Sequence, residues 1–190
     1  MCGGSANSRC LPSTQNGERC WPIASRPPRA TMAARAFSPA SPFTQASLAG
    51  TPSLVFFGYT FCPDVCPVDA RNIGLGLSAV EKSDPALGAK IVPIFISVDP
   101  ARDTPAVLKS FVANFHPRMV GLTGSAAAID AVAKEYAVYY KKGEVTPGGG
   151  YMVDHARATY LMNPEGKPLA LLPQDQTPEA IAAEIKRWVK

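Results

Sequence analysis

The sequence predicts an α/β fold in which helices flank a mixed central sheet. Short apolar runs alternate with stretches of helical period through residues 51–190, and a turn at Asn163–Gly166 separates two further strands near the C-terminus. Strands that alternate with helices are typically parallel, whereas two strands joined by a tight turn form an antiparallel hairpin. With 190 residues, of which 46% are hydrophobic, the chain has enough apolar material for one buried core.

Apolar runs give the expected strands. Ser53–Gly58 and Ile91–Val98 are nearly continuous, as is typical of strands covered on both faces, and Val120–Leu122 is a shorter candidate. The hairpin strands are expected at Ala158–Met162 and Pro168–Leu172. No run approaches the roughly 18 to 20 apolar residues of a membrane-spanning helix. The sequence therefore predicts no transmembrane segment in this chain.

Four helices are expected to connect or follow these strands. Thr104, Ser125 and Thr177 are favourable N-caps, and proline follows two of them in the first helical turn. The helices are expected over Val65–Lys82, over 105–116, over 126–136 and from Pro178 to about Lys190. Gly74 and Gly76 fall within the first helix and are expected to lower its stability by roughly 1 kcal/mol each relative to Ala. The order of elements predicts a thioredoxin-like fold with one inserted helix and a C-terminal hairpin and helix.

Residues 1–47 are predicted to form a poorly ordered tail ahead of a domain at 48–190. The first 50 residues combine six Pro, seven Ser and five Arg with no sustained period of 2 or 3.6. Cys2, Cys10 and Cys20 have irregular spacing and no nearby His, which does not favour a zinc module. No apolar stretch follows the basic residues, so no export signal is recognised.

The charge distribution does not favour nucleic-acid binding. The net charge of +4 arises in the first 50 residues, whereas residues 51–190 hold 14 Lys and Arg against 14 Asp and Glu. A domain that binds DNA or RNA usually presents a basic stripe. We therefore expect no nucleic-acid partner.

Cys62 and Cys66 form the first candidate site. They lie in the string CPDVCP, between a buried strand and a helix. If the helix starts within this string, a separation of four places both sulfurs on one face, close enough to share a metal or to form a disulfide. A helix N-terminus also favours the thiolate, which is the form that binds metal. A pair of core cysteines, or a stabilising disulfide, is the alternative interpretation.

The two histidines have different expected roles. His116 lies at a helix end, where a positive imidazole would interact with the helix dipole, and we expect a structural role. His155 precedes a strand that the topology places beside the first strand. This brings it to the carboxyl edge of the sheet, near the cysteines. A surface histidine that binds nothing is the alternative.

Cys62, Cys66 and His155 together favour copper. Two thiolates and one imidazole form a soft set of three ligands suited to Cu(I), while a structural zinc site would require a fourth protein ligand that the domain does not supply. Asp154 either orients the imidazole or caps a turn. Asp99, which ends the second strand at the same edge, either supports the site or belongs to a turn.

Five short strings stand out in the domain. They are Phe57–Pro67 (FGYTFCPDVCP), Phe95–Pro100 (FISVDP), Arg102–Pro105 (RDTP), Val120–Gly124 (VGLTG) and Val153–His155 (VDH). Together they resemble the Sco/SenC family of copper chaperones, and the resemblance runs from about Leu48 to the C-terminus. It implies a thioredoxin-like fold that binds one copper ion per chain, as Cu(I) or Cu(II), and helps to assemble the binuclear copper centre of cytochrome c oxidase. The ligands of the family fall on Cys62, Cys66 and His155.

The resemblance also implies partners and a location. The partner would be the copper-bearing subunit of cytochrome c oxidase or another copper chaperone. The location would be the periplasm or the outer face of the cytoplasmic membrane, or the mitochondrial intermembrane space in a eukaryote. The cysteines of the family are also redox-active, so Cys62 and Cys66 would form a disulfide. The first 50 residues depart from the family, whose members usually carry an anchor and a β-hairpin before the first sheet strand.

We favour a metallochaperone over an enzyme, with a thiol-disulfide oxidoreductase that acts on partner cysteines as the alternative. Thioredoxin-type enzymes generally place two residues between their cysteines, whereas three separate Cys62 from Cys66. Thr60, two residues before Cys62, is a weaker indication of a peroxiredoxin-like peroxidase. Tyr59 and Phe61 would suit partner contact in a metal-free interaction module, although an aromatic residue after a strand is more often part of the core.

Overall fold

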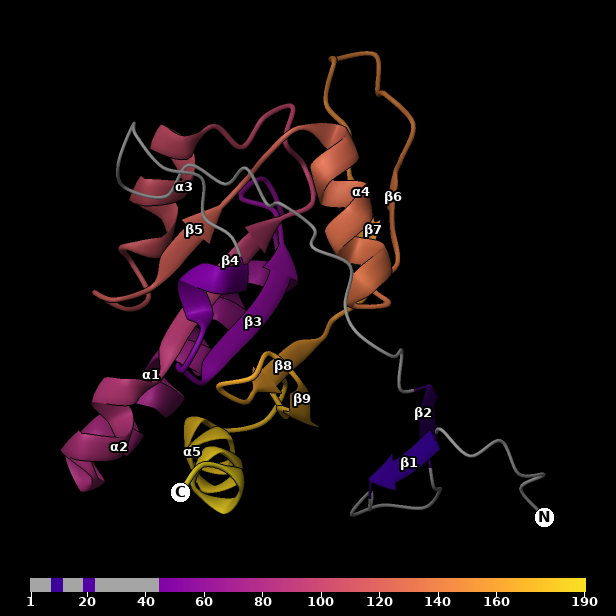
Figure 1. Ribbon diagram of the computed structural model, residues 1–190. Coiled ribbons are helices and arrows are strands. Elements are labelled where there is room, and N and C mark those ends of the chain that lie inside the picture. Colours follow the sequence, from indigo (N-terminus) through magenta and orange to yellow (C-terminus); the bar gives the residue numbers. More distant parts are fainter. Residues whose placement is uncertain (1–7, 12–18, 23–44) are drawn as a thin grey trace.

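The centre of the molecule is a five-stranded sheet in the order β5-β4-β3-β8-β9 (Figure 1). The computed structural model describes residues 8–11, 19–22 and 45–190. The parallel strands are β3 (Ser53–Gly58), β4 (Val92–Ser97) and β5 (Val120–Leu122). Next to β3, β8 (Thr159–Met162) is antiparallel, and β9 (Pro168–Leu171) pairs antiparallel with β8. The predicted mixed sheet is confirmed, including the hairpin beside the first strand.

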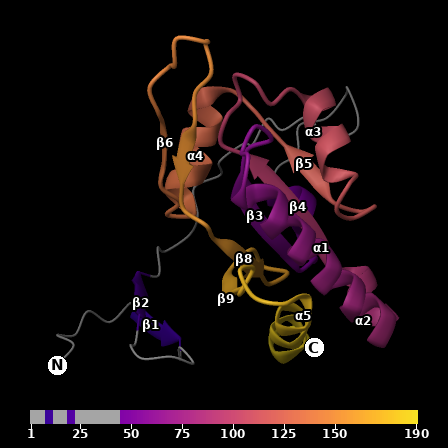
Figure 2. The same ribbon diagram turned by 180° about the vertical axis from the view of Figure 1, so that it is seen from behind.

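Helices cover both faces of the sheet. α1 (Val65–Ser83) packs against α5 (Pro178–Trp188) on the face nearer the viewer in Figure 2. α4 (Ala126–Glu135) lies on the opposite face, and α3 (Pro105–Val112) packs along β5. All six residues of β3 and five of the six in β4 are buried, as their continuous apolar sequence predicts.

The expected N-caps form at three helices. The side-chain oxygens of Thr104, Ser125 and Thr177 each accept a hydrogen bond from the backbone N–H three residues later. These bonds satisfy donors that the first helical turn leaves unpaired. The beginnings of α3, α4 and α5 are therefore set by the local sequence.

Two structural features were not predicted. α2 (Pro85–Lys90) follows α1 directly, and its N-cap Asp84 accepts from the N–H of Leu87 at 2.9 Å. β6 (Tyr140–Lys142) and β7 (Val153–His155) form an antiparallel pair that is separate from the central sheet. The loop between them extends away from the sheet (Figures 1 and 2). His155 thus lies on a strand of its own hairpin.

The two glycines of α1 lie at close contacts. A Cβ on Gly74 would lie 2.4 Å from the carbonyl oxygen of Phe115, and one on Gly76 would lie 2.6 Å from Cγ2 of Ile181. Both distances are too short for a real Cβ. The glycines therefore allow α1 to approach the loop after α3 and the helix α5.

In the N-terminal part, β1 (Ser8–Leu11) and β2 (Arg19–Pro22) pair antiparallel, and the 3-10 helix η1 (Gln45–Leu48) leads into β3. The strands β1 and β2 were not predicted, since these short segments show no alternation. The rest of the predicted tail before residue 45, including Cys2, lies outside the described residues. None of the helices within the described ranges is long and apolar enough to cross a membrane.

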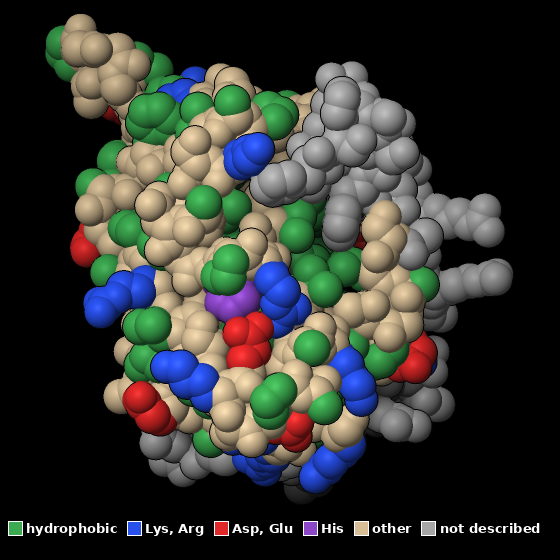
Figure 3. Space-filling view, turned by 90° about the vertical axis from the view of Figure 1, so that its left-hand side faces the viewer, with side chains coloured by type: hydrophobic (Ala, Val, Ile, Leu, Met, Phe, Trp, Pro, Cys, Tyr) green, Lys and Arg blue, Asp and Glu red, His purple; other side chains and the backbone are tan. Residues whose placement is uncertain are grey.

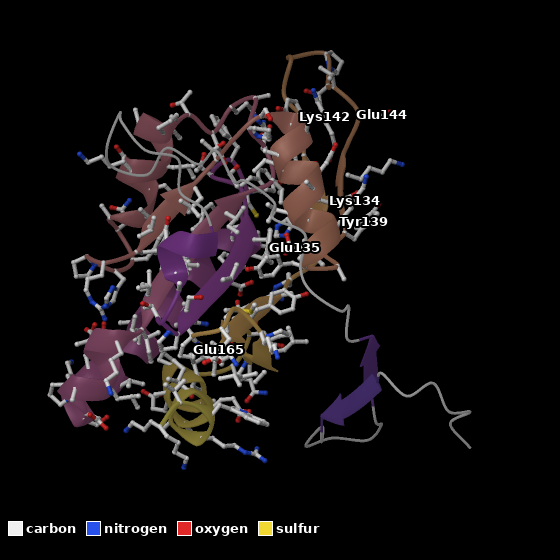
Figure 4. All side chains as sticks on the ribbon, viewed as in Figure 1. Lys134, Glu135, Tyr139, Lys142, Glu144 and Glu165 are labelled. Atoms are coloured by element: carbon white, nitrogen blue, oxygen red, sulfur yellow. The ribbon has the colours of Figure 1, made fainter. Side chains whose placement is uncertain are left out.

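Charges of both signs are interspersed over the surface. Figure 3 shows Lys and Arg beside Asp and Glu on the side that carries α1, α2 and α3. On the side of α4 and β6, Lys134 and Lys142 lie along the same region as Glu144, with Glu165 farther away (Figure 4). These faces reflect the equal numbers of positive and negative residues at 51–190.

Candidate metal centre

Cys62, Cys66 and His155 meet at the carboxyl edge of β3. Both Sγ atoms and a ring nitrogen of His155 all lie within 4.8 Å of one another. Sγ of Cys66 lies 3.1 Å from Nε2 of His155. The cysteines come from the turn into α1, whereas the histidine comes from β7, so two distant parts of the chain build the cluster. The structure thus brings together the three predicted ligands.

The turn before α1, rather than a shared helix face, brings the two cysteines together. α1 begins at Val65, so Cys62 precedes the helix and Cys66 is its second residue. The backbone N–H of Cys66 donates to Sγ of Cys62 at 3.4 Å. Both are free thiols, with Cys66 buried and Cys62 half-buried.

Burial determines the acidity of Cys66. It raises the pKa of this thiol far above its usual range, and a backbone hydrogen bond from Tyr59 offsets only part of this effect. The helix N-terminus therefore does not give a thiolate at Cys66 in the metal-free protein, because burial favours the neutral thiol. A thiolate at this position requires a cation beside it.

His155 presents Nε2 to the cysteines. Its other ring nitrogen, Nδ1, lies 3.1 Å from the carbonyl oxygen of Ala156, to which it donates in the neutral tautomer. Burial lowers the pKa of His155, which favours that neutral ring. The ring also packs edge-on against Tyr59, with centroids 5.8 Å apart. The free lone pair of Nε2 is thus directed at the sulfurs.

Asp154 does not take the orienting role that the sequence suggested. Side chains alternate along β7, so Val153 is buried, Asp154 is exposed and His155 is half-buried. The Asp154 carboxylate therefore lies on the other face of the strand from the imidazole. The carbonyl of Ala156 occupies the position beside Nδ1 instead.

Asp99 lies at the same sheet edge but serves the segment that leads into β7. Its carboxylate accepts from the hydroxyl of Tyr151 at 2.7 Å and from Nε of Arg102. Arg102 Nη1 donates to the carbonyl of Tyr151 at 3.0 Å, and its guanidinium stacks 3.6 Å from the centre of that ring. Asp99 thus fixes the chain at Tyr151, four residues before His155.

The aromatic residues around the cysteine turn divide into core and surface. Tyr59 is buried, and its hydroxyl accepts from the N–H of Val153 at 3.3 Å. Phe61 is 53% exposed and stacks on Arg102. Tyr59 is therefore a core residue, the more frequent case for an aromatic after a strand, and only Phe61 offers a surface for a partner.

His116 has a structural role, which depends on hydrogen bonds to Glu81 and Arg118. It is buried, its Nδ1 accepts from the N–H of Arg118 at 3.2 Å, and its Nε2 lies 3.3 Å from Oε2 of Glu81. Burial lowers the pKa of His116, and the bond to Glu81 offsets this only in part. The expected interaction of a positive imidazole with the helix dipole is therefore replaced by a neutral ring that bridges two elements.

Sequence reasoning missed several residues that support the site. Asp103 is buried and accepts from Thr60, two residues before Cys62. Asp69, on α1, forms an ion pair with Arg157, two residues after His155. The local sequence offers one indication of this ion pair, namely that Asp69 is an acidic residue three positions after Cys66 on the same helix. Its partner Arg157 lies 88 residues away along the chain.

The chain matches a family model and several known proteins. The SCO1/SenC family model matches residues 38–190. The yeast (Saccharomyces cerevisiae) mitochondrial protein SCO2 is 37% identical over 150 residues, which cover 78% of this chain and 49% of that protein. The chain spans about half the length of the curated relatives it matches.

Two solved structures resemble the whole domain. Copper-bound ScoI of Bradyrhizobium japonicum is 44% identical with a TM-score of 0.69, covering 77% of this chain and 90% of that one. BsSco is 25% identical with a TM-score of 0.59, and the match covers 86% of this chain and 96% of that one. It is described as having a disulfide switch and as a member of the Sco family of cytochrome c oxidase assembly proteins. With its thioredoxin-like fold and the matched family model, the chain belongs to the SCO1/SenC family.

Proposed function

We propose that the domain at residues 48–190 binds one copper ion through Cys62, Cys66 and His155 and delivers it during assembly of the binuclear copper centre of cytochrome c oxidase. The observation that carries the proposal is the meeting of two sulfurs and one imidazole nitrogen within 4.8 Å. Copper-bound ScoI of the same family supports the choice of metal, and the description of BsSco supports the assembly role.

The donor set fits a soft monovalent ion. Thiolates and imidazole bind Cu(I) well, and three ligands satisfy it, whereas structural zinc sites are closed by four protein ligands. In the part of the chain that the structure describes, no fourth Cys, His, Asp or Glu joins the group of Cys62, Cys66 and His155. Copper is therefore the better match to this site.

Proton release accompanies loading. Cys62 and Cys66 bind as thiolates, so each must lose its proton, whereas Nε2 of His155 is already free in the tautomer set by Ala156. Because burial penalises an uncompensated thiolate at Cys66, cation binding and deprotonation are coupled there. Cys62 is the more exposed sulfur, so we expect a recipient's ligand to approach the copper from its side.

Replacing His155 tests the proposal. We expect the reduced wild-type protein to bind one equivalent of Cu(I), measured by competition with a colorimetric chelator, and His155→Ala to bind about 10- to 1,000-fold more weakly, since one of three ligands is lost. The exposed neighbour Asp154→Asn is the matched control and should bind as the wild type does. Equal copper affinity in His155→Ala would remove the histidine from the site.

Thiol-disulfide exchange is the second candidate function. The two sulfurs lie within 4.8 Å, and the N–H of Cys66 donates to Sγ of Cys62. The disulfide switch ascribed to BsSco supports a redox-active pair. Fast reduction of insulin by the protein, unchanged in His155→Ala, would favour this function, since disulfide exchange does not require the imidazole.

We also propose a place of action. The matched relatives include a mitochondrial protein, and the similar structures include that of a bacterial Sco protein. The intermembrane space or the periplasmic side of the cytoplasmic membrane suits delivery to the copper-bearing subunit of cytochrome c oxidase or exchange with another copper chaperone. Localisation of a tagged chain by cell fractionation tests this placement.

A further inference from the structure

An ion pair between a buried carboxylate and an exposed guanidinium joins the two segments that carry the candidate copper ligands. Asp69 lies three residues after Cys66 on α1 and is 0% exposed. Arg157 lies two residues after His155. Its Nε donates to Oδ2 of Asp69 at 3.0 Å, and its Nη2 donates to Oδ1 at 2.6 Å. Two parallel bonds of this kind fix the orientation of both groups as well as their separation.

The backbone of Arg157 is attached to the same helix by a second route. Its carbonyl accepts from Nε2 of Gln174 at 3.0 Å, and the carbonyl of Gln174 accepts from Nδ2 of Asn72 at 3.1 Å. Asn72 lies one helical turn after Asp69. The segment that follows His155 is thus linked to α1 at two points within one turn of the ligand-bearing helix.

We propose that Asp69 and Arg157 are positioning residues that hold Nε2 of His155 at binding distance from Sγ of Cys66, an inference that rests on the proposed copper site. β7 pairs with β6 in a sheet separate from the central one, so the ladder that carries His155 is not continuous with β3. The ion pair provides a fixed link between the segment after His155 and α1, which carries Cys66, because a carboxylate removed from water is strongly held by its partner.

A double-mutant cycle tests the pair. We expect Asp69→Asn and Arg157→Gln each to weaken Cu(I) binding about 10- to 100-fold, as is typical when a group that supports a ligand is lost. The Cu(I) affinity of the double variant should fall by less than the product of the two single fold-changes. The double variant leaves neither a buried unpaired carboxylate nor an unpaired guanidinium. Arg71→Gln removes an exposed positive charge from the same helix and should bind as the wild type does.

The conservative variant Arg157→Lys separates charge from geometry. Lysine keeps the positive charge but cannot form two parallel bonds, so copper binding should fall between that of the wild type and that of Arg157→Gln. Thermal unfolding of every variant is recorded in parallel, and affinities are measured well below each midpoint. A variant that fails to fold is replaced in the comparison by Arg157→Lys.

The metal-free protein provides an independent measurement. The imidazole nitrogen signals of His155 in an NMR spectrum at fixed pH should shift in Asp69→Asn and Arg157→Gln but not in Arg71→Gln. Folded variants with unchanged imidazole signals and unchanged copper affinity would overturn the positioning role. Should the wild type itself fail to bind copper, the proposed function is refuted, while the imidazole signals still decide whether the pair positions His155.

Discussion

Asp103 anchors the turn that carries Cys62. Its Oδ1 accepts from the hydroxyl of Thr60 at 2.6 Å, and its Oδ2 accepts from the N–H of Thr60 at 3.0 Å and from the hydroxyl of Ser97 at 2.6 Å. The carboxylate is fully buried, so all three donors depend on it. One side chain therefore connects the cysteine turn to the end of β4.

Replacing this carboxylate should destabilise the protein. In Asp103→Asn an amide N–H₂ faces a donor that previously met an oxygen, so we expect a loss of about 1–3 kcal/mol in the free energy of unfolding in urea. The exposed Asp154→Asn is the control, with an expected change within about 0.5 kcal/mol. An Asp103→Asn variant as stable as the wild type would contradict the role of the network.

Individual residues were predictable where a local pattern pointed to chemistry. The spacing of Cys62 and Cys66 at a strand-to-helix turn, and the position of His155 before a strand beside β3, were sufficient to predict their meeting. The pairing of Asp69 with Arg157 was not, because an acidic residue within a helix usually lies on its solvent-facing side. Such a partner depends on tertiary packing.

At the scale of elements, α1 depends on glycine for its contacts. Gly76 faces Ile181 of α5, and Gly74 faces the backbone at Phe115. In an isolated helix each would cost about 1 kcal/mol relative to alanine. In the folded protein the lack of a side chain permits the close packing that buries this face of α1.

Alanine at these positions should therefore destabilise the protein instead of stabilising it. We expect Gly74→Ala and Gly76→Ala each to lower the free energy of unfolding by about 1–3 kcal/mol, since a Cβ would overlap with fixed neighbours. Gly148→Ala is the control, because a Cβ there would meet no atom within 4 Å. Denaturant unfolding measures all three, and a gain in stability at Gly74 or Gly76 would refute the close packing.

Elements were predictable in proportion to the strength of their local pattern. β3 and β4 are continuous apolar runs, and the caps of α3, α4 and α5 marked their beginnings to the residue. The pair β6 and β7 was missed because each strand has three residues and largely polar side chains. α2 was missed because six residues show no helical period, although Asp84 with Pro85 was a usable start pattern.

At the scale of the whole molecule, a polar cluster remote in sequence from the cysteines connects α1, α2 and the loop before β5. Arg118 bonds to Glu81 on α1, and its guanidinium also donates to the carbonyl of Gly88 at 2.8 Å and to that of Ile91 at 2.9 Å. His116 completes the cluster as a neutral ring between Glu81 and the N–H of Arg118.

This cluster should make stability depend on pH. Burial lowers the pKa of His116, so as the pH drops the histidine takes up a proton in the unfolded chain before it does so in the folded protein. The free energy of unfolding therefore falls as the pH drops through the ordinary histidine range near 6.5. Burial alone would raise the pKa of Glu81, but the bonds from Arg118 and His116 outweigh this and lower it. A second loss of stability therefore follows at lower pH, where the Glu81 carboxylate becomes protonated.

The variant His116→Gln isolates the first loss. Glutamine offers an amide donor for Glu81 and a carbonyl acceptor for the N–H of Arg118, yet it does not titrate. We expect the wild type to lose stability in urea between about pH 7.5 and pH 5.5, and His116→Gln to lose markedly less over that range. Equal slopes for the two proteins would show that His116 is not held neutral in the folded state.

Metal coordination in the copper-loaded chain tests the account most directly. X-ray absorption at the copper edge reports the atoms bound to the metal, and we expect two sulfur neighbours and one imidazole nitrogen, with one sulfur lost in Cys62→Ser and the imidazole lost in His155→Ala. A copper shell made of nitrogen and oxygen alone, or one unchanged by these substitutions, would contradict the assignment of this site.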